Sequence, residues 1–277
     1  MVTPDQVLGS LSDEARSWLA QAREQVAADP AANLPVLLPQ LPRRLGRDPF
    51  VNGEYATDSL RVNLSAWRTC DAGALLLFQS GDVTDEQLLD LYYHGDMEEK
   101  AMVFRVATCR PITDATVTLL GEAQRTNTSN HFEAAVCDSN LIVRAVGRSG
   151  FGEDDFNRTI LKIAFVDLPL ARVLDACSMA NPELSRMVQD LATEREAAGR
   201  RVWRDTNLLI AHAPTAGSIA RLAGGLEHGD DAHRLAAARG LAFVKDEKLL
   251  ALARERLDRE PVAEICDAIR TALESTD

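Results

Sequence analysis

Aromatic residues are scarce in this sequence, making up 5% of its 277 residues. Aromatic side chains favour strands, whereas the Ala and Leu that dominate here favour helices. The composition therefore argues against a large β-sheet and predicts a helical protein.

Long apolar runs are also missing. The longest ones fall far short of the ~18 residues that a helix needs to span a bilayer, and the N-terminus lacks the basic region, apolar stretch and cleavage site of a secretory signal. We therefore expect a cytoplasmic protein that does not insert directly into the membrane.

Positive charge is in deficit, because 30 Lys and Arg face 42 Asp and Glu, for a formal net charge of −12. Non-specific nucleic-acid binding depends on clustered basic residues that displace counterions, and an acidic surface is repelled by anionic lipids. Nucleic acids and membrane surfaces are therefore not expected as partners.

Metal-binding motifs are absent as well. The cysteines are odd in number and widely spaced, at positions 70, 109, 137, 177 and 266, and the sequence has neither a CxxC pair nor an HExxH motif. The glycine-rich run 147–152 does not join a predicted strand to a helix, so a nucleotide loop is excluded too. We expect reduced core cysteines, no metal and no cofactor.

Helix signals are frequent along the whole chain. Ser12 caps a helix that ends before Asp29-Pro30, while residues 49–59 are expected to form a loop and residues 60–67 a helix. Beyond Pro214, short amphipathic helices with an Arg-Leu-Ala-Ala-Ala-Arg core resemble HEAT-type repeats; they are expected at Ile219–Leu226, Ala232–Phe243, Glu247–Leu257 and Val262–Leu273.

The predicted fold is all-α, an irregular α-solenoid or HEAT-like helical superhelix. We expect residues 1–213 to form a helical region with a polar pocket, on which residues 214–277 pack as one continuous core.

Charged residues recur on helix faces that otherwise look buried. Asn181 caps a helix on which Arg195 lies in the middle of the apolar arc. A buried guanidinium needs a carboxylate or an anion, and Asp190 and Glu194 are the nearest acids. Lys162 and Asn157 lie on the flanks of a helix that is apolar nearly all round.

Two further segments show the same pattern. Arg125 shares a predicted face with Phe132 and Val136, with Glu133 about a quarter turn away. Glu99 lies on the apolar arc of the helix that follows His94, with Arg105 at its edge, and is our preferred partner for Arg195 or Arg125. Asp96-x-x-Glu99 fits either an Mg²⁺–diphosphate site or, in the interpretation we favour, an acidic helix start.

Each of these residues also has a structural interpretation: an ion pair, a lysine that reaches solvent, or an asparagine that caps a helix. Their occurrence in adjacent helices makes a shared polar pocket and a purely structural network equal alternatives. The candidate ligand-binding residues are Glu99, Arg105, Arg125, Asn127, Glu133, Asn157, Lys162, Asn181, Asp190, Glu194 and Arg195.

Several motifs follow one another in a recognisable order. They are Pro42 to Gly46, the apolar run Asp71 to Leu77, Asp96 with Glu99 ahead of Arg105, Arg125-Thr-Asn before a Phe-Glu-Ala helix, Phe156-Asn157 before a Leu-Lys helix, the Asn-Pro-Glu-Leu turn at 181–184, and Glu194 to Arg200. Together, over residues 11–213, they resemble the EboA family of the ebo gene cluster in bacteria and some algal plastids.

The resemblance implies a helical protein encoded beside enzymes and a membrane prenyltransferase, in clusters linked to making or exporting secondary metabolites. The sequence departs from many relatives at Asp138-Ser139-Asn140, where those have Asn-Pro-Tyr-Pro, and at Glu196, where those have Trp. A ligand contacted at these positions would differ from theirs.

Two functions fit the sequence. The first is a non-catalytic accessory protein or metabolite-binding helical scaffold, which binds an anionic or polyhydroxylated small molecule or docks a partner protein of the same gene cluster. The second is an enzyme, metal-independent or Mg-assisted, that acts on a phosphorylated, prenylated or cyclitol-like small molecule. We rank the accessory role first, because the sequence shows neither a recognisable nucleophile–base pair nor a recognisable set of metal ligands.

Overall fold

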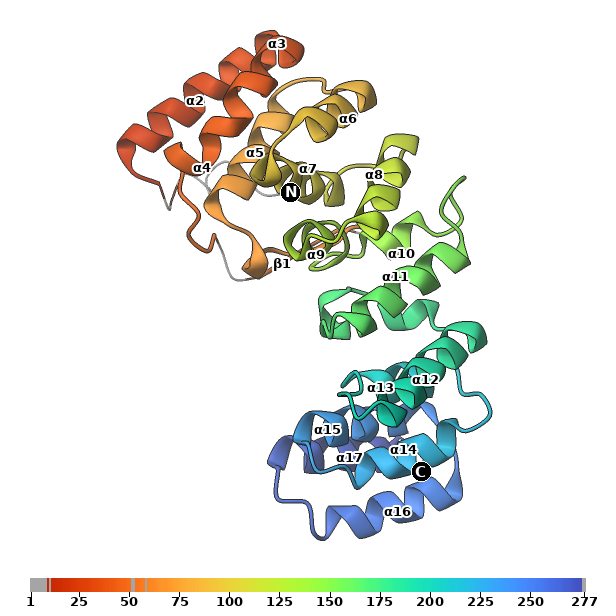
Figure 1. The fold of residues 1–277 in the computed structure, drawn as a ribbon. Coiled ribbons are helices and arrows are strands. Elements are labelled where there is room, and N and C mark those ends of the chain that lie inside the picture. Colours follow the sequence, from red (N-terminus) through yellow and green to blue (C-terminus); the bar gives the residue numbers. More distant parts are fainter. Residues whose placement is uncertain (1–8, 10, 51–52, 58, 276–277) are drawn as a thin grey trace. The chain divides into compact units, whose positions relative to one another are not determined.

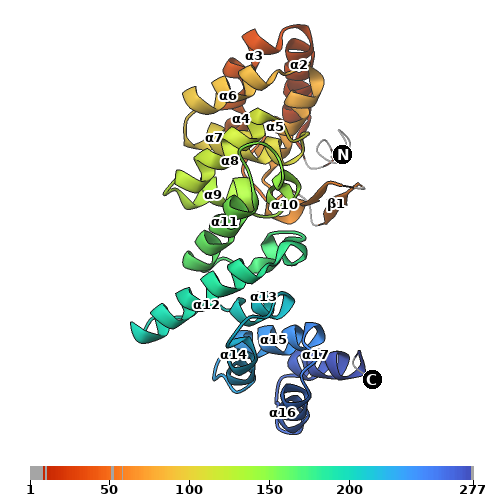
Figure 2. The same ribbon diagram turned by 90° about the vertical axis from the view of Figure 1, so that its right-hand side faces the viewer.

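The computed structural model describes residues 9, 11–50, 53–57 and 59–275. The contacts divide the chain into two compact units, which we call unit 1 (residues up to Phe156, together with Arg172–Leu174) and unit 2 (Asn157–Ala171, together with the residues from Asp175 on). Figure 1 and Figure 2 show that helices dominate each unit. The prediction of a mostly helical fold is thus confirmed.

Unit 1 is built from helices and one hairpin. Its elements are α2 (Asp13–Ala28), α3 (Pro30–Leu37), η1 (Leu38–Gln40), α4 (Leu41–Arg44), β1 (Glu54–Ala56), β2 (Arg61–Asn63), η2 (Leu64–Ala66), α5 (Thr69–Ser80), α6 (Asp85–His94), α7 (Met97–Thr108), α8 (Asp114–Arg125), α9 (Ser129–Val136), α10 (Leu141–Ala145) and the start of α11 (Glu153–Phe165).

The helix starts of unit 1 follow from local sequence. The Ser12 hydroxyl accepts the Ala15 N–H at the start of α2, and Pro35 lies in the short α3, where a proline interrupts the backbone hydrogen bonds. Asp71, expected to cap α5, instead lies two residues inside it and accepts the backbone N–H of Arg68. Local capping chemistry thus places these helix starts to within about three residues.

Strand β1 interrupts the expected loop at 49–59, of which residues 51, 52 and 58 lie outside the described residues. The expected helix at 60–67 is wrong except at η2, because β1 and β2 form a short antiparallel hairpin. The pairing places Tyr55 opposite Val62, which is buried. Val62 also bridges to Ser139. A β-branched residue in contact with a distant segment holds this region extended, and local helix propensity does not reveal that contact.

The core of unit 1 lies between packed helices. Helix α5 packs against α2 and α7, and α7 packs against α9. The buried residues of α5 form a continuous run from Thr69 to Phe78, so this part of the helix is covered on all sides.

Unit 2 contains the rest of α11 and the later helices. Its further elements are η3 (Leu170–Arg172, of which Arg172 belongs to unit 1), η4 (Ala176–Met179), α12 (Pro182–Ala197), α13 (Thr206–His212), α14 (Ser218–Leu226), α15 (Asp231–Gly240), η5 (Leu241–Phe243), α16 (Glu247–Leu257) and α17 (Ala263–Glu274). The predicted C-terminal helices agree closely with α14 to α17.

Helix α15 is central to unit 2, because it packs against α13, α14 and α17. Its small residues, Ala236, Ala237 and Ala238, are buried and let the neighbouring helices approach closely. Gly240 lies where a Cβ would come within 2.9 Å of the Ala211 side chain. The spacing of the helices therefore depends on small side chains along α15.

Among the helices that the structure describes, none is long and apolar enough to cross a membrane.

All five cysteines are unpaired, and burial raises the pKa of Cys70 and of Cys137 to about 12. Thiols with such high pKa values remain protonated and behave as small core residues, as the sequence predicts.

Candidate functional site

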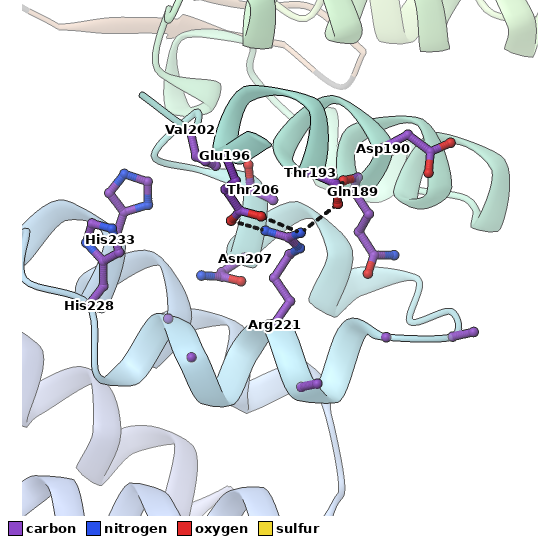
Figure 3. Close-up of a pocket in the computed structure, with 15 residues that line it drawn as sticks. Gln189, Asp190, Thr193, Glu196, Val202, Thr206, Asn207, Arg221, His228 and His233 are labelled. Atoms are coloured by element: carbon purple, nitrogen blue, oxygen red, sulfur yellow. Dashed lines mark hydrogen bonds and ion pairs between the residues drawn. The ribbon is translucent and has the colours of Figure 1, made fainter. Parts of the chain in front are cut away.

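A pocket of ≈ 590 Å³ lies between helices of unit 2 (Figure 3). It is bounded by α12, α13, α14 and the first turns of α15. Its lining residues are Gln189, Asp190, Thr193, Glu196, Val202, Thr206, Asn207, Ala216, Gly217, Ala220, Arg221, Gly224, Gly225, His228 and His233. This volume falls in the range of small-molecule sites.

The pocket exists because one wall lacks side-chain bulk. On α12, Gln189, Thr193 and Glu196 recur at helical spacing and so share one face. On α14, the lining positions include Gly224, where a Cβ would meet no atom within 4 Å. The missing side chain at Gly224 therefore leaves space on this side of the pocket.

One ion pair joins the two sides of the pocket. Arg221 Nη1 and Nη2 donate to the two carboxylate oxygens of Glu196 at 2.8 and 3.3 Å, and Nη2 also donates to Thr193 Oγ1 at 3.0 Å. Figure 3 shows the guanidinium of Arg221 reaching from α14 to α12. Since the bidentate pair neutralises Arg221, this cation is already satisfied before any ligand arrives.

Two histidine rings form another part of the lining. The rings of His228 and His233 lie 4.2 Å apart between centroids, with 36° between their planes. Burial lowers the pKa of His233, and the neighbouring His228 lowers it further. His233 is therefore uncharged at neutral pH and offers a neutral, polar, aromatic surface.

Asn207 contributes a buried carboxamide. The residue is 5% exposed, and within the described part of the chain its Oδ1 has no hydrogen-bond partner. Figure 3 shows its side chain below the Arg221–Glu196 pair. Buried carbonyl oxygens are normally paired, and this one has less than 1 Å² of accessible surface.

A buried arginine holds the loop before α15. Arg234 donates to the carbonyl of His228 at 2.9 Å and to that of Gly229 at 3.3 Å, and it pairs with Glu260. The position of His228 in the pocket is therefore fixed by an ion network behind it.

The adjacent glycines of α14 give a direct stability prediction. A Cβ at Gly224 would meet no atom within 4 Å, whereas a Cβ at Gly225 would lie 2.1 Å from Asn207 Nδ2 and 2.9 Å from Ala237 Cβ. Gly224→Ala is expected to raise the free energy of unfolding by up to about 1 kcal/mol through helix propensity. Gly225→Ala is expected to lower it by about 1–3 kcal/mol through overpacking. Urea titrations followed by circular dichroism measure both, and equal effects of the two substitutions would contradict the packing of Asn207 against α14.

The sequence candidates Arg105 and Glu133 meet in unit 1 through two residues that sequence analysis did not assign to a site. Arg105 Nη1 lies 3.2 Å from Asp138 Oδ2, and Arg172 Nη2 lies 2.7 Å from the same oxygen. Arg172 Nη1 also reaches Glu133 Oε2 at 2.5 Å. Arg105 and Glu133 are thus members of one ion network, which we call the Asp138 network (Arg105, Glu133, Asp138 and Arg172).

Asn157 and Asn181 are also brought together. Their side chains exchange hydrogen bonds of 2.9 and 3.3 Å, and Asn181 caps α12 by accepting the Leu184 N–H at 2.8 Å. On the same helix as Asn157, Lys162 is half-buried, and burial lowers its pKa. The predicted cap at Asn181 is confirmed.

The expectation that Arg125 points into the core and pairs with Glu99 is wrong. The Arg125 side chain is 72% exposed and forms an ion pair with Glu122 at 2.7 Å. Glu99 accepts the Asp96 N–H at 2.8 Å in a capping box at the start of α7. Asn127 is exposed beyond the end of α8. The acidic-helix-start interpretation of Asp96-x-x-Glu99 thus describes the observed hydrogen bonds.

The expectation that Arg195 meets a carboxylate is wrong as well. Arg195 donates to the carbonyls of Phe165 at 2.6 Å and Arg201 at 3.2 Å, and its guanidinium lies 5.2 Å from the Phe165 ring centroid. The expected acids lie elsewhere: Asp190 pairs with an exposed arginine and lines the pocket, and Glu194 is exposed on α12. Of the eleven sequence candidates, Asp190 alone lines the pocket of Figure 3.

The pocket residues that sequence analysis missed come from four consecutive helices, α12 to α15, and from the loops between them. A signal was present in one of them, α14, where Gly224-Gly225 interrupts an amphipathic helix. Within the described residues, no group of three or more His, Cys, Asp and Glu is placed to hold a metal ion. The pocket chemistry is therefore that of hydroxyls, amides, neutral imidazole and paired charges.

Comparison with known proteins bears on the predicted family resemblance. No curated protein and no solved structure matches the chain. The model of one family, described as "Metabolite traffic protein EboA", matches residues 5–210 and so covers most of the sequence. This match confirms the predicted resemblance, and the chain belongs to the EboA family.

Proposed function

We propose that this chain binds a small polyhydroxylated metabolite in the pocket of unit 2, as a non-catalytic component of the metabolite handling for which its family is named. The observation that carries the proposal is the lining of the pocket, which combines a volume of ≈ 590 Å³ with hydroxyl, carboxamide and imidazole groups. Groups of this kind both donate and accept hydrogen bonds and therefore complement hydroxyls.

The charges of the pocket support a neutral ligand over an anionic one. Arg221 is paired with Glu196 at 2.8 Å, and Asp190 is paired with Arg186 at 2.5 Å. An anion would have to compete with Glu196 for the guanidinium, at the cost of leaving that carboxylate unpaired. The neutral imidazole of His233 adds no positive charge.

The proposal is tested with purified protein. Native mass spectrometry reports any small molecule that co-purifies, and thermal unfolding is then followed with myo-inositol, glucose, glucose 6-phosphate and farnesyl diphosphate, each with and without Mg²⁺. We expect the two neutral polyols to raise the melting temperature without Mg²⁺, since a ligand at 100 times its Kd stabilises by about 2.7 kcal/mol. Gly224→Leu is the blocking variant, because a side chain there would extend into open space, and it should abolish the shift while circular dichroism stays helical.

Other outcomes separate the alternatives. A shift produced by the phosphorylated compounds alone, or only with Mg²⁺, followed by turnover of the bound compound, would replace this proposal with an enzymatic function. A shift that persists in Gly224→Leu would place binding outside this pocket. If none of the compounds shifts the curve and nothing co-purifies, the proposal fails.

Further predictions from the sequence are retained as proposals. They are the division at residues 213 and 214, the solenoid arrangement, the cytoplasmic location and the docking of partner proteins encoded in the same gene cluster. The packing of α14 on α15 and of α16 on α17 supports HEAT-like pairing within unit 2.

A further inference from the structure

His233 is a buried side chain of the pocket whose polar atoms find no partner in the protein. It is 8% exposed and lines the pocket near the start of α15. Neither ring nitrogen forms a hydrogen bond within the described residues, and neither is among the unpaired atoms that are closed off from solvent. Both nitrogens therefore keep accessible surface. Because the residue lines the pocket, a molecule bound there can reach the ring.

A second histidine, His228, is held against one side of this ring. The two ring centroids lie 4.2 Å apart, and Figure 3 shows both residues at one side of the pocket, with Asp190 at the other. The backbone N–H of Asp230 donates to His228 Nδ1 at 3.0 Å, and Arg234 holds the carbonyl of His228 at 2.9 Å. His233 thus has a fixed neighbour on one side, and a ligand meets the ring along its edge, where the nitrogens lie.

The charge state of His233 limits what the ring binds. Burial lowers its pKa, and the neighbouring His228 and Arg201 lower it further. Asp230 and Asp167 act in the opposite direction. At neutral pH the ring is uncharged, with one nitrogen that donates and one that accepts. A hydroxyl suits either nitrogen, because it both donates and accepts, whereas a phosphate or a carboxylate offers acceptors alone and leaves the accepting nitrogen unpaired.

We propose that His233 is a specificity-determining residue of this pocket, and that it selects a hydroxyl-bearing ligand through a hydrogen bond at a ring nitrogen. This inference rests on the proposed binding function and adds the protein group that makes the contact. A site built to hydrogen-bond a hydroxyl discriminates strongly against a ligand that lacks it, because the protein group is then left unpaired.

The first test is isothermal titration calorimetry with myo-inositol and glucose as the probes. In His233→Phe the side chain keeps an aromatic ring beside His228 but has no polar atom, whereas His233→Gln keeps a donor and an acceptor. His212→Phe is the matched control. His212 is a half-buried histidine whose ring lies 3.7 Å from that of Phe243 between centroids, and it does not line this pocket.

We expect His233→Phe to weaken binding of the polyols at least about tenfold, because their hydroxyl loses its partner on the protein. His233→Gln should recover part of this loss, and His212→Phe should bind as the wild type does. Circular dichroism and the melting temperature of each ligand-free variant report whether its fold is kept, so a loss of binding through unfolding is recognised.

The second test needs no variant of His233. Nitrogen-15 NMR of wild-type protein with labelled histidine observes the ring nitrogens directly, and replacing the other histidines one at a time identifies the signals of His233 by elimination. Saturating myo-inositol should shift a ring-nitrogen resonance of His233 and leave those of His212 in place.

Three results overturn the inference while the binding function stands. They are His233→Phe that binds the polyols as tightly as wild type, a loss of binding in His212→Phe equal to that in His233→Phe, and wild-type protein that binds a polyol with unchanged His233 nitrogen resonances. The NMR result decides the question even if His233→Phe does not fold. Wild-type protein that binds neither polyol overturns the proposed function and the inference with it.

Discussion

Replacing Asp138 with alanine is expected to lower the free energy of unfolding of unit 1 by about 3–5 kcal/mol, because two arginines would lose their shared carboxylate. The Asp138 side chain is 2% exposed and that of Arg105 is 8% exposed. Arg172 donates to both oxygens of Asp138, at 3.0 and 2.7 Å. These hydrogen bonds also raise the pKa of Arg172 and so favour its charged form.

The backbone of Asp138 adds to this effect. Its φ of 60° lies in the left-handed region, which Asp and Asn tolerate better than Ala does. The Asn63 N–H donates to the carbonyl of Asp138 at 2.7 Å, and the Asp138 N–H donates to the carbonyl of Arg172. Asp138 thus joins strand β2 to the segment Arg172–Leu174 through its backbone and its side chain together.

One further variant separates the contribution of the side-chain charge from that of the backbone, and a second variant is a surface control. Chemical denaturation and hydrogen exchange of the α7 and α9 amides are the measurements. Asp138→Asn keeps the backbone preference and the shape but removes the charge, so it should recover only part of the loss. Glu122→Ala removes the partner of the exposed Arg125 and should cost about 1 kcal/mol or less. If Asp138→Ala and Glu122→Ala cost the same, the Asp138 network does not stabilise unit 1.

The helix starts were predictable because their chemistry is local. Ser12, Asp96 and Asn181 each accept backbone N–H groups within three residues along the chain. Information of this kind lies within one turn of sequence, and no tertiary contact is needed to read it. The helices of unit 2 beyond Pro214 were predictable for the related reason that their apolar spacing is regular.

The direction of individual arginines was less predictable. Arg125 was assigned to the face of Phe132 by continuing one helical wheel, but α8 ends at Arg125 and α9 begins at Ser129. The helical wheel was thus continued across the break between two helices. Residues of different helices do not share one angular position per residue, so the wheel does not predict which of them lie on the same face. Arg195 lies in the last turn of α12, where a long side chain can turn back to carbonyl groups beyond the helix.

The pocket and the Asp138 network depend on contacts that the sequence does not encode locally. Arg172 lies 34 residues from Asp138, and Asn207 meets Gly225 only through the packing of two helices. The sequence had marked Asp138 and Glu196 as departures from many relatives. Their partners, Arg172 and Arg221, became visible only with the fold.

Replacing Glu260 with alanine is the second large expected effect, with a loss of about 3–5 kcal/mol in the free energy of unfolding of unit 2. The Glu260 side chain is completely buried, and it pairs with Arg234 at 2.9 Å and Arg256 at 2.7 Å. It also accepts the Val262 N–H at 3.1 Å, next to the start of α17. One substitution thus leaves two largely buried cations and a backbone donor without this carboxylate.

The same carboxylate gives a defined pH dependence. Burial alone would raise the pKa of Glu260, but hydrogen bonds from Arg234 and Arg256 outweigh burial and lower the pKa to about 2. An unfolded chain has a glutamate pKa of about 4.3. Because the folded pKa is the lower one, the stabilisation is fully present above about pH 4.3 and is lost as the pH falls towards 2, in total about 3 kcal/mol.

Glu260→Gln isolates this ionisation, since it keeps the shape of the side chain and cannot carry the charge. The difference in unfolding free energy between wild type and Glu260→Gln should be constant from pH 7 to about 5 and should shrink by about 3 kcal/mol between about pH 4.3 and 2. Urea titrations at each pH, with Glu264→Gln as the matched control, measure it. Glu264 pairs with Arg239 at 2.8 Å on the surface, and its variant should differ from wild type by about 1 kcal/mol or less at every pH. A difference for Glu260→Gln that does not change with pH would show that hydrogen bonding without charge accounts for the role of Glu260, and that the arginines tolerate a neutral partner.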